Sequence, residues 1–212
     1  MRSLVLISFV GVGFGCAADP VAPGHVSYDS VRERLGAEPT RLVATAQPAA
    51  GTIDAQRRTA DGWQDGTTSV SVTNGELVLA AATDGSLRAS KLAIAIDPIE
   101  IPEQVFGKPA RLSDVRLTLS APAQAPATWL DDNTATATLT VELDLAWSLA
   151  FDTSKTPLGG QHLPALPVDL TLAGAGDHVD ATLALHTDEL WSWADLVRLD
   201  QLQLTITAAT VD

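Results

Sequence analysis

The feature that most constrains the fold of this chain is a long alternation of apolar and polar residues. The apolar residues occupy consecutive odd positions: Ala137, Leu139, Val141, Leu143, Leu145, Trp147, Leu149 and Phe151. Threonine, glutamate, aspartate and serine fill most of the even positions between them. A helix would scatter the odd residues around its circumference, whereas a strand places all of them on one face. The stretch therefore predicts a long strand with one buried face.

This strand is long for a globular protein. At about 3.3 Å per residue it would extend roughly 50 Å, whereas most strands have about 3 to 10 residues. We expect it either to bend at a bulge and contribute to two sheets, or to belong to an unusually tall sheet. Ala146 and Ala150 are small residues on the polar face. They mark the place where we expect a bend or a covering layer.

Shorter alternations of the same kind occur along much of the remaining chain. They are separated by Asn74-Gly75, by Asp84-Gly85 and by residues 174–177, and these residue types tolerate the backbone conformation of tight turns. We predict a hairpin in which residues 68–72 and 76–81 flank Asn74-Gly75. Strands joined by such short turns pair antiparallel. The predicted fold class is all-β, an antiparallel, long-stranded sheet of about eight to ten strands that forms a β-sandwich or a curved or closed sheet.

Several segments interrupt the strand pattern. Residues 27–35, with Ser27 as a cap and Gly36 as a stop, predict at most one short N-terminal helix. Residues 155–166 are rich in proline and glycine and predict a loop. Residues 188–193 break the alternation and fit one helical turn.

The first sixteen residues have the layout of a secretory signal. Arg2 precedes an apolar run, and the small residue Gly15 precedes Cys16, the single cysteine of the chain. The run is too short to cross a bilayer core of about 30 Å. An unpaired cysteine in an exported protein cannot form an internal disulfide, so its presence needs another explanation.

The Gly15-Cys16 pair after this apolar run resembles the processing site of a bacterial lipoprotein precursor. The resemblance covers only these residues, and Gly13 stands where that family usually has leucine. It implies a signal peptide at 1–15, a lipidated Cys16 that begins a tether at 16–26, and one all-β domain at 27–212. A simple secretory signal with an incidental Cys16, or an uncleaved anchor, remains open.

The resemblance also implies a location. A lipid on Cys16 would anchor the exported chain to a membrane of the bacterial cell envelope. Asp19 lies three residues after Cys16 and not directly after it, so the inner-membrane retention signal of such lipoproteins is not evident, and we expect the outer membrane. A secreted or periplasmic soluble protein is the alternative.

The charge of the chain restricts its partners. Lys and Arg number 13 against 26 Asp and Glu, which gives a formal net charge of −13. Such a surface repels the phosphate backbone, so we expect no nucleic acid partner. It also disfavours direct adhesion to anionic headgroups. Contact with a membrane is therefore expected through the lipid on Cys16.

No motif of a common enzyme class is present in the sequence. The chain has no Gly-x-Ser-x-Gly, no His-Glu-x-x-His and no phosphate-binding glycine loop in its β region. The group Asp177, His178 and Asp180 and the group Asp131-Asp132-Asn133 carry metal-ligand residue types, but these residues are also common in turns. We expect a protein that is not an enzyme and that has no cofactor and no metal.

Three functions remain open. In the first, two apolar faces fill each other, and the protein is a structural or interaction module; this is the favoured hypothesis because a fold alone does not imply a ligand. In the second, small inward residues leave room for a lipid or another hydrophobic ligand. In the third, Trp191 and Trp193 contact a carbohydrate or a protein partner, although they would equally serve to plug one end of the core. A cavity of several hundred Å³ would favour the second function.

Overall fold

Most of the chain lies in one antiparallel sheet. A computed structural model describes residues 27–151, 154–193 and 196–211. Within these ranges the strands are β1 (Thr40–Ala44), β2 (Gln47–Thr59), β3 (Gly62–Ala81), β4 (Leu87–Ile96), β5 (Ile99–Ile101), β6 (Ala110–Leu119), β7 (Ala123–Ala125), β8 (Thr128–Asp131), β9 (Thr134–Phe151), β10 (Ser154–Ala175), β11 (His178–Trp193) and β12 (Val197–Thr210). The helices in these ranges are α1 (Val31–Ala37) and α2 (Glu103–Phe106). The predicted all-β, antiparallel fold class is confirmed.

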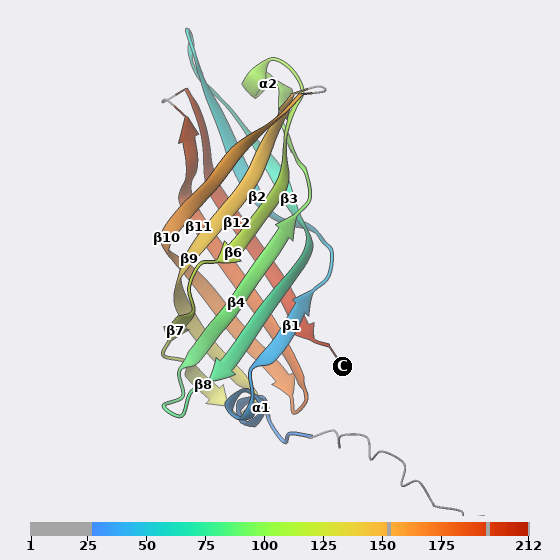
Figure 1. The fold of residues 1–212 in the computed structure, drawn as a ribbon, viewed down its shortest axis with the longest axis vertical. Helices are drawn as coiled ribbons and strands as arrows, with labels where there is room; N and C mark the ends of the chain where they lie inside the picture. Colours follow the sequence, from blue (N-terminus) through green and yellow to red (C-terminus); the bar gives the residue numbers. More distant parts are fainter. Residues whose placement is uncertain (1–26, 152–153, 194–195, 212) are drawn as a thin grey trace, which may run out of the picture.

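The sheet closes on itself (Figure 1). Hydrogen-bonded neighbours follow one another in the order β3, β2, β12, β11, β10, β9, β6 and β4, and β4 pairs again with β3. Shorter strands extend this ring: β1 pairs with β3 and β12, β5 with β6, β7 with β4, and β8 with β9. Of the arrangements left open by the sequence, the chain adopts the closed sheet. It contains 12 strands and not the expected eight to ten.

The alternation in β9 separates the inside of the closed sheet from the outside. From Ala135 to Trp147 every odd residue is buried, whereas the even residues between them are exposed. The inward residues of all the long strands join one hydrophobic core. Burial of this apolar surface is the main force that stabilises such a fold.

In place of the bend expected in β9, the two neighbouring strands have register shifts. β9 runs through 18 residues, but β6 shifts register between Ser113 and Arg116, and β10 shifts between Pro157 and Gly159. Both shifts lie opposite Trp147 and its neighbours, and bulges of this kind increase the local twist. Beyond this level the pattern changes, because Ala150 is buried while Ala146 remains exposed.

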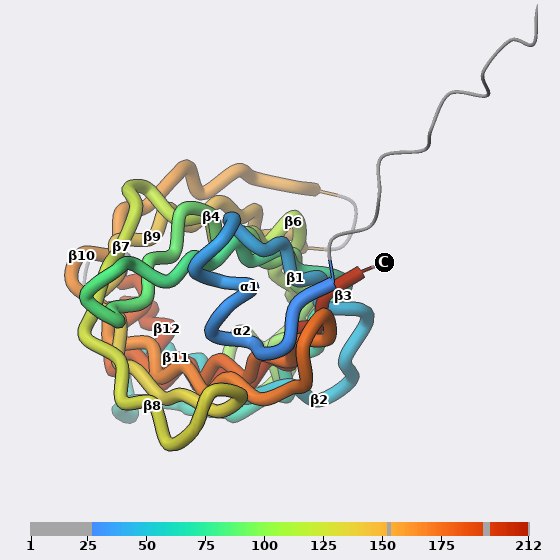
Figure 2. Tube along the Cα trace, turned by 90° about the horizontal axis from the view of Figure 1, so that it is seen from below, coloured from blue at the N-terminus to red at the C-terminus, as the bar shows by residue number. Residues whose placement is uncertain are grey.

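Helix α1 covers one end of the closed sheet, called here the α1 end (Figure 2). Its buried residues are Val31 and Leu35. The Val31 amide donates to Asn133 Oδ1 at 3.1 Å, and the Tyr28 amide donates to Asp177 Oδ1 at 3.0 Å. Asn133 lies in the turn between β8 and β9, and Asp177 lies in the turn between β10 and β11. These two turns thus hold the helix in place.

The bounds expected for this helix were wrong. α1 begins at Val31, and Ser30 caps it by accepting a hydrogen bond from the Glu33 amide at 3.1 Å. The helix also passes through Gly36, which was expected to stop it.

Helix α2 covers part of the opposite end, called here the α2 end (Figure 1). Its Val105 is fully buried, and Arg57 Nη1 donates to the carbonyl oxygen of Phe106 at 3.0 Å. The ring of Phe106 packs edge-on against Phe151 with centroids 5.3 Å apart. The expectation of at most one helix was therefore wrong, because the proline-rich connection contains this additional turn.

The predicted hairpin at Asn74-Gly75 is also wrong. Both residues lie inside the continuous strand β3, and neither has a positive φ. Here β3 changes its neighbour: Val72 pairs with Gln47 of β2, whereas Gly75 pairs with Ala44 of β1. A Cβ at Gly75 would lie 3.2 Å from the Cβ of Ala44. The glycine permits this close approach between strands and does not form a turn.

The predicted loop at 155–166 and the predicted helical turn at 188–193 are strands. The first lies in β10 and the second in β11, but these two strands pair with each other only from the Val168–Leu185 pair toward the α1 end. Toward the α2 end they diverge, and each keeps one hydrogen-bonded neighbour (Figure 1). Proline is tolerated in a strand that is paired on one side only, which explains Pro157 and Pro164 in β10.

Gly51 provides a test of the contact between β2 and β12. A Cβ at Gly51 would overlap the carbonyl oxygen of Gln203, whereas a Cβ at Gly36 in α1 would meet nothing within 4 Å. We expect Gly51→Ala to lower the free energy of unfolding by about 1 to 3 kcal/mol through overpacking. We expect Gly36→Ala to raise it by up to about 1 kcal/mol through helix propensity. Urea unfolding measures both, and an unchanged midpoint for Gly51→Ala would contradict the close approach.

Candidate functional site

The interior of the closed sheet has a small void near the α2 end. It measures about 10 Å³ and is lined by apolar side chains and one indole: Ile53, Ile96, Ile99, Leu112, Val115, Leu117, Leu145, Trp147, Leu190 and Leu202. A space of this size holds at most one water molecule. Side chains fill this part of the interior, and the larger hollows described below lie on the outer face.

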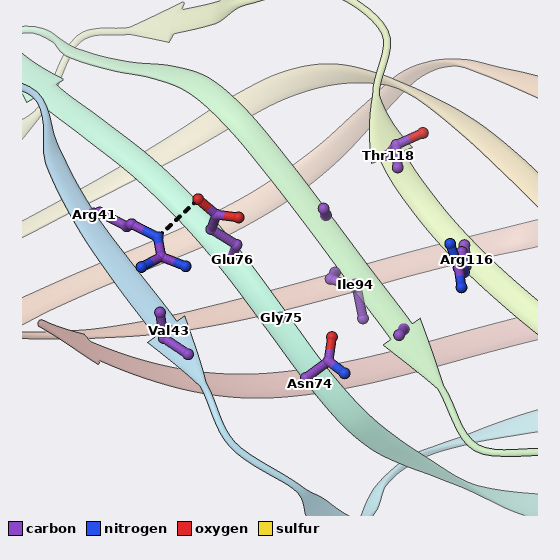
Figure 3. Close-up of a pocket in the computed structure, with 10 residues that line it drawn as sticks. Arg41, Val43, Asn74, Gly75, Glu76, Ile94, Arg116 and Thr118 are labelled. Carbon is purple, nitrogen blue, oxygen red and sulfur yellow. Dashed lines mark hydrogen bonds and ion pairs between the residues drawn. The ribbon is translucent and has the colours of Figure 1, made fainter. Parts of the chain in front are cut away.

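A groove of about 470 Å³ crosses the outer face of β1, β3, β4 and β6 (Figure 3). Its floor contains Ala93 and Ala95, which are half-buried outward residues of β4. Ala93 pairs with Glu76 on one side and Thr118 on the other, and Ala95 pairs with Asn74 and Arg116. Two alanines between longer side chains leave a trough along β4.

Ion pairs organise the β1 and β3 side of this groove. Glu76 accepts a hydrogen bond from Arg41 Nε at 2.9 Å and another from Lys91 Nζ at 2.7 Å. The hydrogen bond from Lys91, and to a smaller extent that from Arg41, lowers the pKa of the Glu76 carboxyl below its ordinary value. Glu76 is therefore ionised at neutral pH and neutralises only part of the charge of its two partners.

The β6 side of the groove offers polar groups that have no protein partner. The Arg116 side chain is exposed and makes no hydrogen bond or ion pair within the described part of the chain. The pKa of Asp114 in the same strand is lowered mainly by a hydrogen bond from Lys155, and the charge of Arg116 makes the smallest contribution. The Asn74 side-chain amide, across the floor from it, likewise makes no hydrogen bond with any described residue. Donors on both sides of Ala95 thus remain available.

A second surface pocket lies at the α1 end beside β7 and has a volume of about 520 Å³. Its polar groups bind one another: Ser86 Oγ donates to Asp84 Oδ1 at 2.6 Å, and Gln124 Nε2 donates to Ser86 Oγ at 2.6 Å. The Gly85 carbonyl oxygen accepts from Trp129 Nε1 at 3.0 Å. Because these groups are already satisfied, this pocket is a weaker candidate than the groove on β4.

A serine, a histidine and an aspartate also meet on the outer face. His162 Nδ1 lies 3.1 Å from Asp144 Oδ1 and 3.5 Å from Ser120 Oγ. In a nucleophilic triad the carboxylate and the hydroxyl use different ring nitrogens, so that the imidazole can accept the hydroxyl proton. Here both contacts involve the same nitrogen, and the arrangement does not activate Ser120.

Trp191 lies partly inside the closed sheet. Its ring packs edge-on against Trp147, with centroids 5.6 Å apart, and it is half-buried. The backbone of Trp193 pairs with Val197 in the neighbouring strand, but its side chain lies outside the described residues. The position of Trp191 is compatible with a plug, and contact of either tryptophan with a partner stays a prediction.

The remaining site residues from the sequence are accounted for as follows. Cys16, the predicted lipidation site, lies outside the described residues. Asn133 and Asp177, from the two weighed metal groups, bind the backbone of the segment that carries α1. Within the described ranges, no three His, Cys, Asp or Glu side chains are grouped so as to hold a metal ion. The two helices of these ranges are both too short to span a membrane.

Sequence reasoning missed the groove. The signal was present in the run from Leu92 to Ile96, where alanine occupies both outward positions between inward Leu and Ile. The neighbouring walls could not be identified, because Asn74-Gly75 was interpreted as a turn and the strand register was unknown. The chain matches no protein-family model and no curated protein.

The lowered pKa of Glu76 predicts a pH dependence. A carboxyl whose pKa is lower in the folded state stabilises the fold above its unfolded pKa, and this contribution disappears as the pH falls through the folded pKa. We therefore expect the urea midpoint to fall more between pH 6 and pH 3 in the wild type than in Glu76→Gln. Glu103→Gln, at an exposed glutamate without an ion pair in the described structure, is the control. Equal pH dependence in the wild type and Glu76→Gln would contradict the ion pairs.

Proposed function

We propose that this chain is a lipid-anchored protein of the bacterial cell envelope whose closed sheet is a non-catalytic interaction module. In this proposal the module binds its partner on the outer face and not in the interior. The observation that supports it is the size of the interior void beside Trp147, which measures only about 10 Å³. Pockets that enclose small molecules usually measure about 300 to 1,000 Å³.

The anchor is the lipid proposed for Cys16. The described chain begins beside α1, and β12 ends at the same end of the sheet (Figure 1). A tether attached there would direct the α1 end toward the membrane. The α2 end and the outer face of the long strands would then be accessible to other components of the envelope.

A carrier for a hydrophobic ligand is the second candidate, and one observation favours it. Trp147 Nε1 is buried and has no hydrogen-bond acceptor among the residues that the structure describes. A buried donor without an acceptor is costly, and an apolar ligand with a single acceptor atom would satisfy it. Such a ligand would have to displace core side chains, because the void is too small for it.

The anchor is tested by labelling. Cells that express the full chain are fed an alkyne-tagged fatty acid and then fractionated. We expect the wild type and the control Ala18→Ser to be labelled and to occur in the membrane fraction. Cys16→Ser is expected to lose the label and to leave that fraction, because it lacks the sulfur that carries the lipid. Label that persists in Cys16→Ser would contradict the proposal.

The filled interior is tested by a native mass spectrum of Cys16→Ser after gentle purification. We expect the mass of the polypeptide alone. A co-purifying mass of lipid size that is lost on denaturation would contradict the interaction module and support the carrier. A second native mass spectrum, taken after delipidation and addition of an excess of palmitate, extends the test to a protein that lost its ligand during purification.

A further inference from the structure

We propose that the groove on β4 binds a small anionic amphiphile, with its phosphate or carboxylate on Arg116 and its apolar part on Ala93 and Ala95. This inference rests on the proposed function, because it assigns a ligand class to the outer face. Three neighbouring features support it. The guanidinium of Arg116 has no ion pair in the described structure, Ala93 and Ala95 form the floor, and the carboxylate of Glu76 is bound by two cations.

The anionic group is recognised at the row formed by Asn74, Ala95 and Arg116. Ala95 pairs with both of its neighbours, so the two polar residues lie about two strand spacings, roughly 10 Å, apart at their backbones. Asn74 and Arg116 thus lie on the two sides of β4, on β3 and β6 (Figure 3), where each can contact a group placed on Ala95. The planar guanidinium of Arg116 presents paired donors that match the oxygens of a phosphate or a carboxylate.

The apolar part of the ligand lies on the next row. Ala93 is flanked by Glu76 and Thr118, and Val43 pairs with Glu76 from β1. Ala93, Ala95 and Val43 are all half-buried, so a short alkyl or ring group placed on them removes apolar surface from water. The alanine methyl groups leave the depth that such a group needs.

Glu76 does not repel the anion strongly, because two cations hold its carboxylate. Arg41 and Lys91 bind its two oxygens at 2.9 and 2.7 Å. The charged residues that line the groove are Arg41, Arg116 and Glu76, so the lining itself carries one more positive than negative charge on a chain of net charge −13. The local charge favours an anion, and its attraction decreases as salt increases.

The surroundings of the groove limit the ligand to one anionic group. Asp97 directly follows the last residue of β4 and accepts a hydrogen bond from Thr73 at 2.6 Å. Asp144 pairs with Thr118 on the far side of β6. A polyanion that extends past the groove would meet these carboxylates, whereas a compact head with a short apolar body would not.

The test is a titration of full-length Cys16→Ser, followed by the backbone amide resonances of Ala93, Ala95 and Arg116. The probes are hexyl phosphate, hexanoate, hexanol and inorganic phosphate. We expect hexyl phosphate or hexanoate to bind more tightly than hexanol and than inorganic phosphate, since only the amphiphiles use both parts of the groove. Binding of hexanol as tight as that of both anions, or no binding of any probe, would overturn the inference.

Variants separate the two contacts. Arg116→Gln should weaken the anionic amphiphiles about tenfold, as expected for a charge-assisted hydrogen bond. Arg88→Gln, at an exposed arginine of β4 that does not line the groove, should leave the affinity unchanged. Ala95→Leu fills the floor and should weaken the amphiphiles as well. An equal loss in Arg88→Gln, or none in Arg116→Gln, would overturn the inference.

Vesicles distinguish the source of the ligand. Binding to phosphatidylglycerol vesicles but not to phosphatidylcholine vesicles, with loss in Arg116→Gln, identifies a lipid headgroup. Binding of the short probes without vesicle binding identifies a free amphiphile. A probe that shifts Trp147 but not the groove would refute both the groove and the non-carrier proposal. A groove that binds nothing in a protein of clean polypeptide mass would refute the groove alone.

Discussion

The structure depends on the burial of one continuous apolar face. The inward residues of β9 cannot remain in water, and a strand of this length also needs hydrogen bonds on both sides. A closed sheet meets both needs, because it turns the apolar face of β9 inward and gives this strand a neighbour on each side, β6 and β10. The two ends of the ring then need other residues to cover the apolar interior. Val31 and Leu35 of α1 cover one of them, and Val105 of α2 lies at the other.

Function is therefore expected on the outside of the sheet. The residues that fill the interior are mostly Leu, Val, Ile and Ala, and close packing of such side chains leaves little space for a ligand. Most polar and charged side chains lie at outward positions. On β4 these positions include two alanines between longer polar and charged side chains, which produces the groove. This division relates the alternation in the sequence directly to the proposed binding surface.

The fold class was predictable because alternation is a local property of the sequence. The closure was not, since it depends on pairs such as Val72 with Ile96 that only the three-dimensional register defines. The errors have the same origin. Asn74-Gly75 was interpreted from its turn propensity, but in the folded chain it lies where β3 changes partners. The prolines of residues 155–166 suggested a loop, but they are tolerated because that half of β10 is paired on one side. The groove depends on the register of four strands, β1, β3, β4 and β6, so the sequence alone could indicate only its alanine floor.

The central claim is that side chains fill the interior of the sheet around Trp147, and the indole N–H of this residue reports on it most directly. Trp147 is 4% exposed, whereas Trp63 is 40% exposed. In a ¹H–¹⁵N spectrum, with the resonance assigned by its loss in Trp147→Phe, the Trp147 signal should persist in D₂O long after that of Trp63 has exchanged. It should also be unaffected by palmitate. Exchange as fast as that of Trp63, or a shift on addition of palmitate, would show an accessible interior and contradict the account.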